Sequence, residues 1–303
     1  MKRTFLVLLL IVLSAASAVS ARAGDAPPGT GEAARPFGVG PQYDTSHVYV
    51  APADLERFVA SFVATFGGKA TAQSTTTVTP TPSTTLLQAA LAPVGLVSAF
   101  GFTSPVPYPF GSERTGYLVT DLDAAVRAAR DDGASIVVAP FDDPIGRDAV
   151  VEWPGGVRMQ FYRHTVQTQS PALETVPENR VYVPSDAADA FVSDFSRFAA
   201  ATLVSDDAHA PGIEVGDPAG TYRRIRLESL FGKLTVLATD GHLAYPYGRE
   251  TTGYEVADLS GTLAKARAAG AAVLVPPYTS EGREAAFVAF PGGYVAEIHS
   301  RVK

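Results

Sequence analysis

The sequence predicts an α+β fold made of two tandem copies of one domain. Three observations support this prediction: one motif occurs twice, a Pro-Gly-Gly turn occurs twice, and each copy alternates short strands with helices. The motif spans residues 108–117 and 245–254, and the turns at 154–156 and 291–293 follow it at the same spacing. A repeat this long is a duplicated domain, because solenoid repeats have periods of about 20–50 residues.

The repeat also sets the expected domain boundaries. We predict a first domain at 43–166 and a second domain at 178–303. The segment 167–177 between them contains two prolines and small polar residues, which is typical of a linker. Residues 24–42 are rich in glycine and proline and are expected to form a flexible leader before the first strand.

The first half of copy one is expected to begin with a strand and a helix. His47–Val50 is a short β-run, and Ala53–Phe66 carries apolar residues at helical spacing. The threonine-rich stretch 71–85 favours an edge strand or a turn, because its side chains are β-branched and prolines interrupt it. Leu96–Phe102 is expected to form a further strand.

The second half of copy one repeats this order. We expect a strand at Tyr117–Val119 and a helix at Leu122–Arg130, with Asp121 as its N-cap. Strands at Ala149–Trp153 and Val157–Tyr162 close the copy. Copy two is expected to have strands at 254–256, 273–275, 286–290 and 294–299 and a helix at 259–269. Each copy therefore contains a β-α-β-β-β module twice.

The amino terminus has the layout of a secretory signal. Lys2 and Arg3 precede an apolar run at 5–13, and Ala21-Arg22-Ala23 is the best cleavage site, with Ala16-Ser17-Ala18 as the alternative. The apolar run is shorter than the ~20 residues that a membrane-spanning helix needs. Residues 1–23 are therefore predicted to be removed, and the mature protein is expected in the periplasm or outside the cell, with no membrane attachment.

Composition excludes several classes of function. The 303 residues are 46% hydrophobic, which is ample for packed cores. The chain has no cysteine, so disulfides, thiolate metal sites and cysteine nucleophiles are excluded. The formal net charge is −7 and no basic cluster occurs, so nucleic acid is not an expected partner. A small-molecule ligand is the expected partner, and the oligomeric state is left open.

Particular residues carry a resemblance to a known family. Residues 117–125 (YLVTDLDAA), their counterpart at 254–259 (YEVADL) and the two strands after the Pro-Gly-Gly turns resemble the vicinal oxygen chelate superfamily, which includes glyoxalases, bleomycin-resistance proteins and dioxygenases. The resemblance implies two curved mixed sheets, each forming a cup that can hold a small molecule. It does not fix the reaction, because this fold serves lyases, isomerases, dioxygenases and binding proteins.

The resemblance also indicates where a metal would be bound. In metal-dependent members, ligands come from the first and last strands of the modules. The matching positions are His47, Arg114 and Gln160 in copy one and Arg180, Thr251 and Glu297 in copy two. A divalent cation needs about three imidazole or carboxylate ligands, and an arginine repels it. Neither copy has the family's ligand set, so no metal cofactor is expected, with a divalent metal kept as the alternative.

The candidate site residues follow from these positions. His47, Gln160, Arg114 and Arg180 are predicted to contact a substrate or ligand, and Tyr108, Tyr245 and Tyr247 to form an aromatic lip. Arg180 is expected either to pair with Glu297 across the floor of the second cup or to clamp an anionic ligand. His164 falls in a predicted loop. Glu113 and Glu250 occupy matching places and are expected to share a structural role or a catalytic one.

Two hypotheses on function remain at this point. The first is an exported protein that binds a small molecule without the family's metal. The second is a metal-dependent lyase, isomerase or dioxygenase with a rebuilt site. Glu297 and His299 are its candidate catalytic residues, because they lie two apart on a predicted strand and face the same way, and His242 could join them.

Overall fold

The computed structural model describes residues 37–302 except 167, 169 and 241–249. The predicted secretory signal and most of the predicted leader lie outside the described residues. Within the described part no helix is long and apolar enough to cross a membrane.

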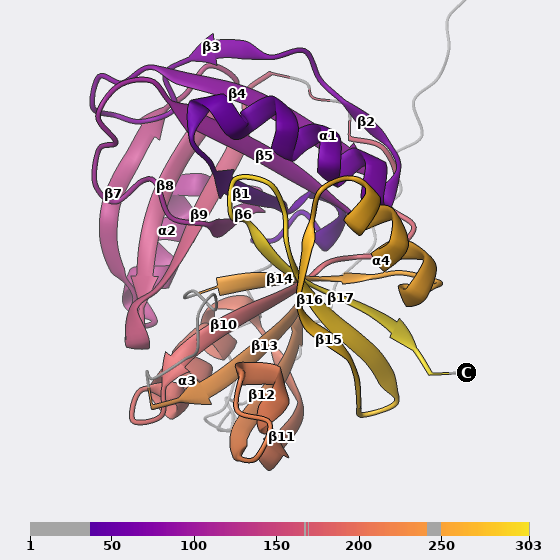
Figure 1. The fold of residues 1–303 in the computed structure, drawn as a ribbon. Coiled ribbons are helices and arrows are strands. Elements are labelled where there is room, and N and C mark those ends of the chain that lie inside the picture. Colours follow the sequence, from indigo (N-terminus) through magenta and orange to yellow (C-terminus); the bar gives the residue numbers. More distant parts are fainter. Residues whose placement is uncertain (1–36, 167, 169, 241–249, 303) are drawn as a thin grey trace, which may run out of the picture. The chain divides into compact units, whose positions relative to one another are not determined.

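The first sheet has nine strands in the order β2-β4-β5-β1-β6-β9-β8-β7, and β3 pairs with β4 (Figure 1). Strand β1 is parallel to β5 and antiparallel to β6, so the sheet is mixed. Its strands are β1 Thr45–Tyr49, β2 Lys69–Ala70, β3 Ser74–Thr76, β4 Thr85–Ala92, β5 Gly95–Phe102, β6 Arg114–Leu118, β7 Ser135–Asp142, β8 Gly146–Trp153 and β9 Val157–His164.

The second sheet has eight strands in the order β11-β12-β13-β10-β14-β17-β16-β15, which repeats the topology of the first. The register repeats as well, since His47 lies opposite Arg114 in the first sheet and Arg180 lies opposite Thr251 in the second. The predicted α+β fold with two tandem mixed sheets is confirmed. The strands are β10 Glu178–Pro184, β11 Thr202–Pro211, β12 Thr221–Ser229, β13 Gly232–Thr239, β14 Glu250–Glu255, β15 Ala272–Ser280, β16 Arg283–Ala289 and β17 Val295–Arg301.

Each module has one α-helix after its first strand. Two of the helices begin at an aspartate cap: the Asp121 side chain accepts a hydrogen bond from the Ala124 N–H at 3.0 Å, and Asp258 does the same for Gly261. The helices are α1 Leu55–Phe66, α2 Leu122–Asp131, α3 Ala188–Ala199 and α4 Leu259–Ala268, with short 3₁₀ turns η1 Pro41–Tyr43, η2 Pro52–Asp54, η3 Pro154–Gly156 and η4 Gly212–Val215.

The threonine-rich stretch 71–85 is mostly not a strand. Only Ser74–Thr76 pairs with β4, and the segment that contains the two prolines turns back. The Thr79 hydroxyl holds this turn through contacts with the Thr81 carbonyl at 2.6 Å and the Ser83 hydroxyl at 2.8 Å. The sequence analysis did not predict β4 at 85–92, because its alanine- and leucine-rich sequence lacks the β-branched residues typical of strands.

The first of the two main apolar cores is built from both copies of the repeat. Helix α1 of copy one packs against α4 of copy two. The ring centroids of Phe62 and Tyr254 lie 5.4 Å apart, and those of Phe58 and Tyr294 lie 5.6 Å apart. Phe290 is buried in the same cluster. The helix side of each sheet is therefore covered partly by the other copy.

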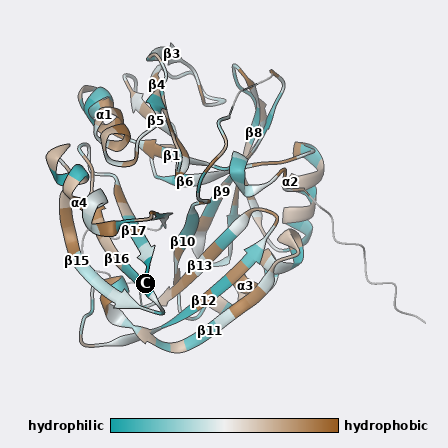
Figure 2. Cartoon of the chain, turned by 90° about the vertical axis from the view of Figure 1, so that its right-hand side faces the viewer, coloured by the Kyte–Doolittle hydropathy of each residue, from teal (hydrophilic) through white to brown (hydrophobic). Residues whose placement is uncertain are grey.

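The second core has the same arrangement with the roles of the copies exchanged. Helix α3 of copy two packs near α2 and η3 of copy one, and Figure 2 shows α1 beside α4 and α2 beside α3. The ring of Phe198 lies 5.4 Å from Trp153 and 5.1 Å from Phe161. Phe37 stacks on Phe198 at 5.6 Å, so the last residues of the predicted leader join this core.

Candidate functional site

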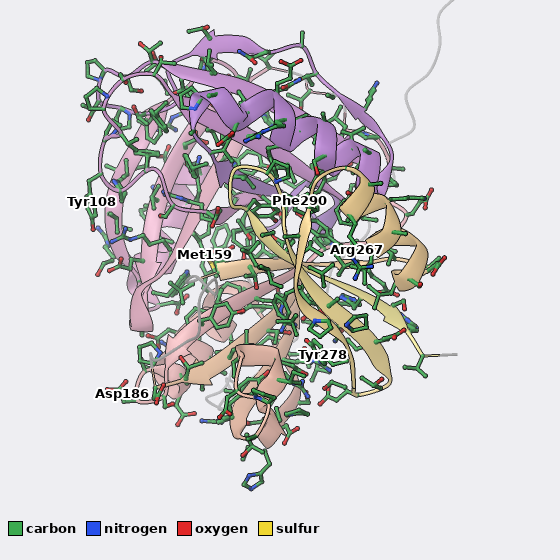
Figure 3. The ribbon with its side chains drawn as sticks, viewed as in Figure 1. Tyr108, Met159, Asp186, Arg267, Tyr278 and Phe290 are labelled. Carbon is green, nitrogen blue, oxygen red and sulfur yellow. The ribbon has the colours of Figure 1, made fainter. Side chains whose placement is uncertain are left out.

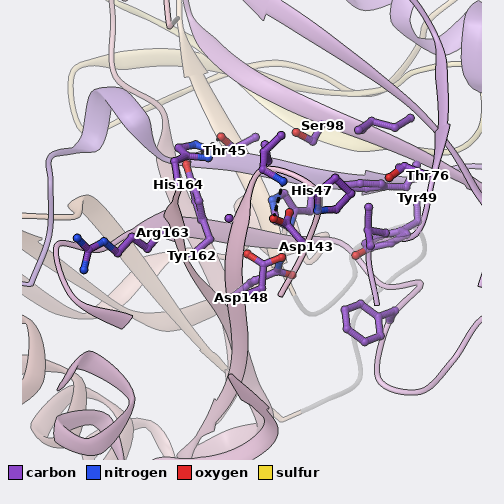
Figure 4. Close-up of a pocket in the computed structure, with 18 residues that line it drawn as sticks. Thr45, His47, Tyr49, Thr76, Ser98, Asp143, Asp148, Tyr162, Arg163 and His164 are labelled. Atoms are coloured by element: carbon purple, nitrogen blue, oxygen red, sulfur yellow. Dashed lines mark hydrogen bonds between the residues drawn. The ribbon is translucent and has the colours of Figure 1, made fainter. Parts of the chain in front are cut away.

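The first cup is the face of the first sheet opposite α1 and α2, and it contains a cavity of about 140 Å³ (Figure 4). Side chains alternate between the two faces of a strand, and this alternation determines which residues line the cavity. Thr45, His47 and Tyr49 of β1 line the cavity, whereas Val48 between them is buried in the apolar core. On β9 the side chains of Gln160, Tyr162 and His164 point into the cup in the same way.

One wall of the cavity is aromatic and aliphatic. Tyr49 stacks on Phe100 with ring centroids 5.3 Å apart, and the His47 ring meets Phe100 edge-on at 5.5 Å. Leu87 of β4 and Phe110 complete this wall. Stacked and edge-to-face rings are favourable arrangements, so the wall is rigid and apolar.

His47 is buried and neutral. Burial lowers the pKa of His47 to about 3, the positive charge of Arg114 acts in the same direction, and the neighbouring Gln160 amide opposes them. Neither Nδ1 of His47 nor Oε1 of Gln160 has a hydrogen-bond partner within the described part of the chain. A glycine makes room for the imidazole, because a Cβ at Gly116 would lie 2.8 Å from His47 Nε2.

Arg114 lies directly opposite His47, at a position where the resemblance described above implies a metal ligand. Its side chain is buried, and Nη2 donates a hydrogen bond to the Pro109 carbonyl at 2.7 Å. The guanidinium lies 5.4 Å from the Phe110 ring centroid and 5.9 Å from that of Tyr49. Arg114 is therefore held over the aromatic loop next to the cavity and is not part of the cavity lining.

The sequence analysis missed Asp148, the most perturbed acid of the first cup. Asp148 lies on β8 opposite Tyr162 and is 6% exposed. Burial raises its pKa to about 8, the Asp143 carboxylate adds to the rise, and a hydrogen bond with Gln160 opposes it. The signal in the sequence is a single acid at the start of the apolar strand Ala149–Trp153. His164 was also missed, since it ends β9 and lines the cavity rather than lying in a loop.

The residues of the first cup do not fit a family-type metal. The four strand positions that face one another are His47, Ser98, Arg114 and Gln160, which offer one imidazole, one hydroxyl, one guanidinium and one amide. In the second cup the equivalent positions are Arg180, Thr235, Thr251 and Glu297. Among the described residues, no three His, Asp or Glu side chains are grouped so that they could hold a metal.

The second cup is the matching face of the second sheet, and a buried ionic network fills it. Arg180 pairs with Glu178 at 3.1 Å and lies 3.9 Å from Glu214. Glu214 also binds Arg224, and the Ser280 hydroxyl donates to it at 2.6 Å. Burial opposes ionisation of both acids, but the neighbouring arginines lower the pKa of Glu178 and bring that of Glu214 to about 2. Both carboxyls are therefore ionised.

The structure separates the two residues that the sequence analysis paired across the floor of this cup. Glu297 Oε2 contacts His299 Nδ1 at 2.7 Å, whereas Arg180 turns to Glu178 on its own strand. Glu297 still acts at longer range, because its charge is the main influence that raises the pKa of Arg180 against the effect of burial. The expected direct Arg180–Glu297 pair is replaced by two separate buried contacts.

The predicted aromatic lip is only partly described. Tyr245, Tyr247 and His242 lie outside the described residues. Tyr108 is 77% exposed and lies at the edge of the molecule in Figure 3. Its ring lies 4.9 Å from the Arg158 guanidinium. It does not line the cavity of the first cup, whereas Phe110 two residues later does.

Glu113 and Glu250 meet near the boundary between the copies. Both line a small hollow of about 10 Å³ beside His47 and Arg114. Burial raises the pKa of each to about 7, and the Glu250 carboxylate accepts a hydrogen bond from the Thr115 hydroxyl. This bond joins Glu250 of copy two to copy one, and whether the two glutamates share a structural or a catalytic role stays a prediction.

Comparison with known proteins rests on the fold. No protein-family model matches the sequence, and no curated protein matches it. A variant of 4-hydroxymandelate synthase from Streptomyces coelicolor is 13% identical and matches with a TM-score of 0.59 over 88% of this chain and 93% of that chain. The Mn(II)-bound glyoxalase from Novosphingobium aromaticivorans is 13% identical, with a TM-score of 0.54 over 88% and 83% of the two chains.

A third solved structure has the same architecture. The 2,2',3-trihydroxybiphenyl 1,2-dioxygenase from Sphingomonas wittichii strain RW1 is 13% identical, with a TM-score of 0.53 over 88% of this chain and 91% of that chain. All three proteins belong to one superfamily of paired β-α-β-β-β modules, and identities this low establish the architecture and not the chemistry. The chain therefore has the fold of the vicinal oxygen chelate superfamily, as two tandem domains.

Proposed function

We propose that this protein binds a small molecule in the first cup and that this binding needs no metal ion. The observation that carries the proposal is a cavity of about 140 Å³ in which Nδ1 of His47 and Oε1 of Gln160 lack partners among the described residues. A buried polar atom without a hydrogen bond costs about 1–3 kcal/mol. A ligand that bonds to these atoms would remove that cost, and a cavity of ~150 Å³ is known to hold a single benzene ring.

The charge beside His47 supports binding without a metal. Arg114 is a permanent cation on the strand next to β1, directly opposite His47. Its charge repels a divalent ion from the imidazole that would be the best ligand in this cup. The second cup is a poorer candidate for the binding site, because arginine and glutamate side chains occupy its interior.

The experiment is a fragment-binding screen by ligand-observed NMR on the full chain, with and without EDTA. Ser98→Phe places a ring in the cavity, and Val204→Phe at an exposed position of β11 is the matched control. We expect EDTA to leave binding unchanged and only Ser98→Phe to abolish it. Binding that disappears with EDTA, or that persists in Ser98→Phe, contradicts the proposal.

We also propose that the protein is exported to the periplasm or beyond the cell. Residues 1–23 support this, because they have the charged, apolar and small-residue regions of a secretory signal. Mass spectrometry of protein produced from the complete sequence tests it. The expected product is exported and begins at Gly24, and an uncleaved chain that stays in the cytoplasm would refute export.

The second candidate function is a metal-dependent enzyme with its site rebuilt around Glu297 and His299. The 2.7 Å contact between these two buried side chains favours it, and an Mn(II)-bound glyoxalase shares the fold. This function requires stoichiometric metal in the purified protein and loss of that metal in Glu297→Ala. Protein that contains no metal after growth in metal-replete medium would exclude it.

A further inference from the structure

The lining of the first-cup cavity holds several hydroxyl groups, which can donate or accept, and two acidic side chains, Asp143 and Asp148. Gln160 Oε1, an acceptor, and the His47 ring atom Nδ1 have no hydrogen-bond partner among the described residues. Gln160 and Asp148 are 5% and 6% exposed, so water has little access to them. A ligand that bonds to the two carboxyl groups and to Gln160 Oε1 must bring hydrogen-bond donors.

Positive charge is nearly absent from the lining. Arg163 is the one arginine or lysine among the described residues that line the cavity. Its side chain is exposed, and it pairs in register with Arg147 on the opposite face of the sheet from Gln160 and Tyr162. Figure 4 shows the Arg163 guanidinium turned away from His47 and Asp148. Burial lowers the pKa of His164, so this imidazole supplies no charge at neutral pH.

The Arg114 guanidinium does not neutralise the two aspartates either. It is held by the Pro109 carbonyl above the Phe110 ring, and no ion pair joins it to a carboxylate in the described part of the chain. Aromatic side chains surround the same cavity, and ring faces attract cations. The cavity lining thus combines two carboxyl groups with several aromatic rings, and no ion pair among the described residues neutralises either carboxyl.

We infer that the first cup binds a small primary or secondary amine, with its ammonium group between Asp148 and Gln160 and its apolar part against Phe100 and Leu87. The inference rests on the proposed function and names the chemical class of its ligand. At pH 8 and above, where the Asp148 carboxyl ionises, the ammonium donates to its carboxylate and to Gln160 Oε1, and these charge-assisted bonds are the strong ones. The high pKa of Asp148 agrees, because its surroundings lack the positive charge that an ammonium would supply.

The test measures binding of benzylamine and butylamine against benzyl alcohol and butanol by titration calorimetry on the full chain. The alcohols have nearly the same shape and no charge. We expect each amine to bind about tenfold or more tightly than its alcohol at pH 8, because a hydrogen bond to a charged group is worth that much. Asp148→Asn should remove this preference of the amine over its alcohol.

Further variants keep the inference open to refutation if Asp148→Asn folds poorly. Asp143 lines the same cavity and is partly exposed, so the variant Asp143→Asn should fold. It should weaken amine binding by a smaller factor than Asp148→Asn does. Asp142→Asn, at a side chain that is 88% exposed, is the control and should bind like the parent. Equal binding of amines and alcohols overturns the inference but leaves the proposed function standing. If neither class binds and the fragment screen is also negative, both fail.

Discussion

His47 and Arg114 face each other across β1 and β6, and together with burial this arrangement keeps the imidazole uncharged. A neutral imidazole is the form that binds metals. The positive charge of Arg114, which helps to keep His47 neutral, also repels a metal cation that could bind to the imidazole. The first cup thus offers one side chain suited to a metal, with a permanent cation directly opposite it.

Restoring a ligand set should therefore create a metal site. In the double variant Arg114→His with Gln160→Glu, His47 is joined by a second imidazole and a carboxylate, a set that suits Zn²⁺ or Mn²⁺. We expect one equivalent of metal to bind, measured by calorimetry and metal analysis. The control, Arg114→Lys with Gln160→Glu, keeps a cation and should bind none; equal metal content in both would show that Arg114 does not govern metal binding.

The two halves of the chain should not fold separately. Phe58 and Phe62 of copy one are buried against copy two, and Phe198 of copy two is buried against Trp153 of copy one. We expect the fragments 43–166 and 178–303 to show no cooperative thermal unfolding alone and to regain it when mixed. Phe198→Ala in the full chain should cost about 3–5 kcal/mol of unfolding free energy. A single fragment that unfolds cooperatively would show that each copy has a sufficient core of its own.

Asp148 should make the protein less stable as the pH rises. Its pKa is about 8 in the folded protein, above the ordinary aspartate value of about 3.9, so the unfolded chain loses this proton at a lower pH than the folded protein does. The contribution of this group to stability is largest near pH 4, falls as the pH rises toward 8 and is constant above that. Asp148→Asn should remove this slope, a difference of about 2–4 kcal/mol between pH 4.5 and 8.5 by denaturant unfolding. Asp142→Asn is the exposed control, and parallel pH profiles for the parent and Asp148→Asn would contradict the assignment.

The ionic network of the second cup should be sensitive to loss of one charge. Arg180→Met leaves Glu178 and Glu214 buried without one of their cations, which costs about 3–5 kcal/mol for a buried pair. Arg197→Met breaks an exposed pair and should cost less than about 1 kcal/mol. Urea unfolding of both variants measures the difference. Similar small losses would mean that the remaining arginines Arg224 and Arg283 suffice for these acids.

Features that depend on neighbours in the chain could be predicted from the sequence. The Asp121 cap follows from a side chain three residues from its donor, and the tandem sheets follow from the repeated motif and turns. The strand positions of His47 and Gln160 were predicted from the short β-run at His47 and from the Pro-Gly-Gly turn before Gln160, and both residues line the cavity.

Features that depend on the choice between distant partners could not be predicted. Arg180 has several acids within reach, and only the folded geometry shows that it pairs with Glu178. Glu297 contacts His299 instead. Asp148 looks like an ordinary surface acid until the curl of the sheet encloses it. The exchange of helices between the copies has no local signal, because an amphipathic helix records that one face is buried and not what covers it.

Because each apolar core contains residues of both copies, the cup faces of the two copies can differ without a change in these cores. Since each sheet is covered on its helix side partly by the other copy, the cup face of one sheet can carry buried ion pairs and that of the other a cavity, while the shared apolar cores stay the same.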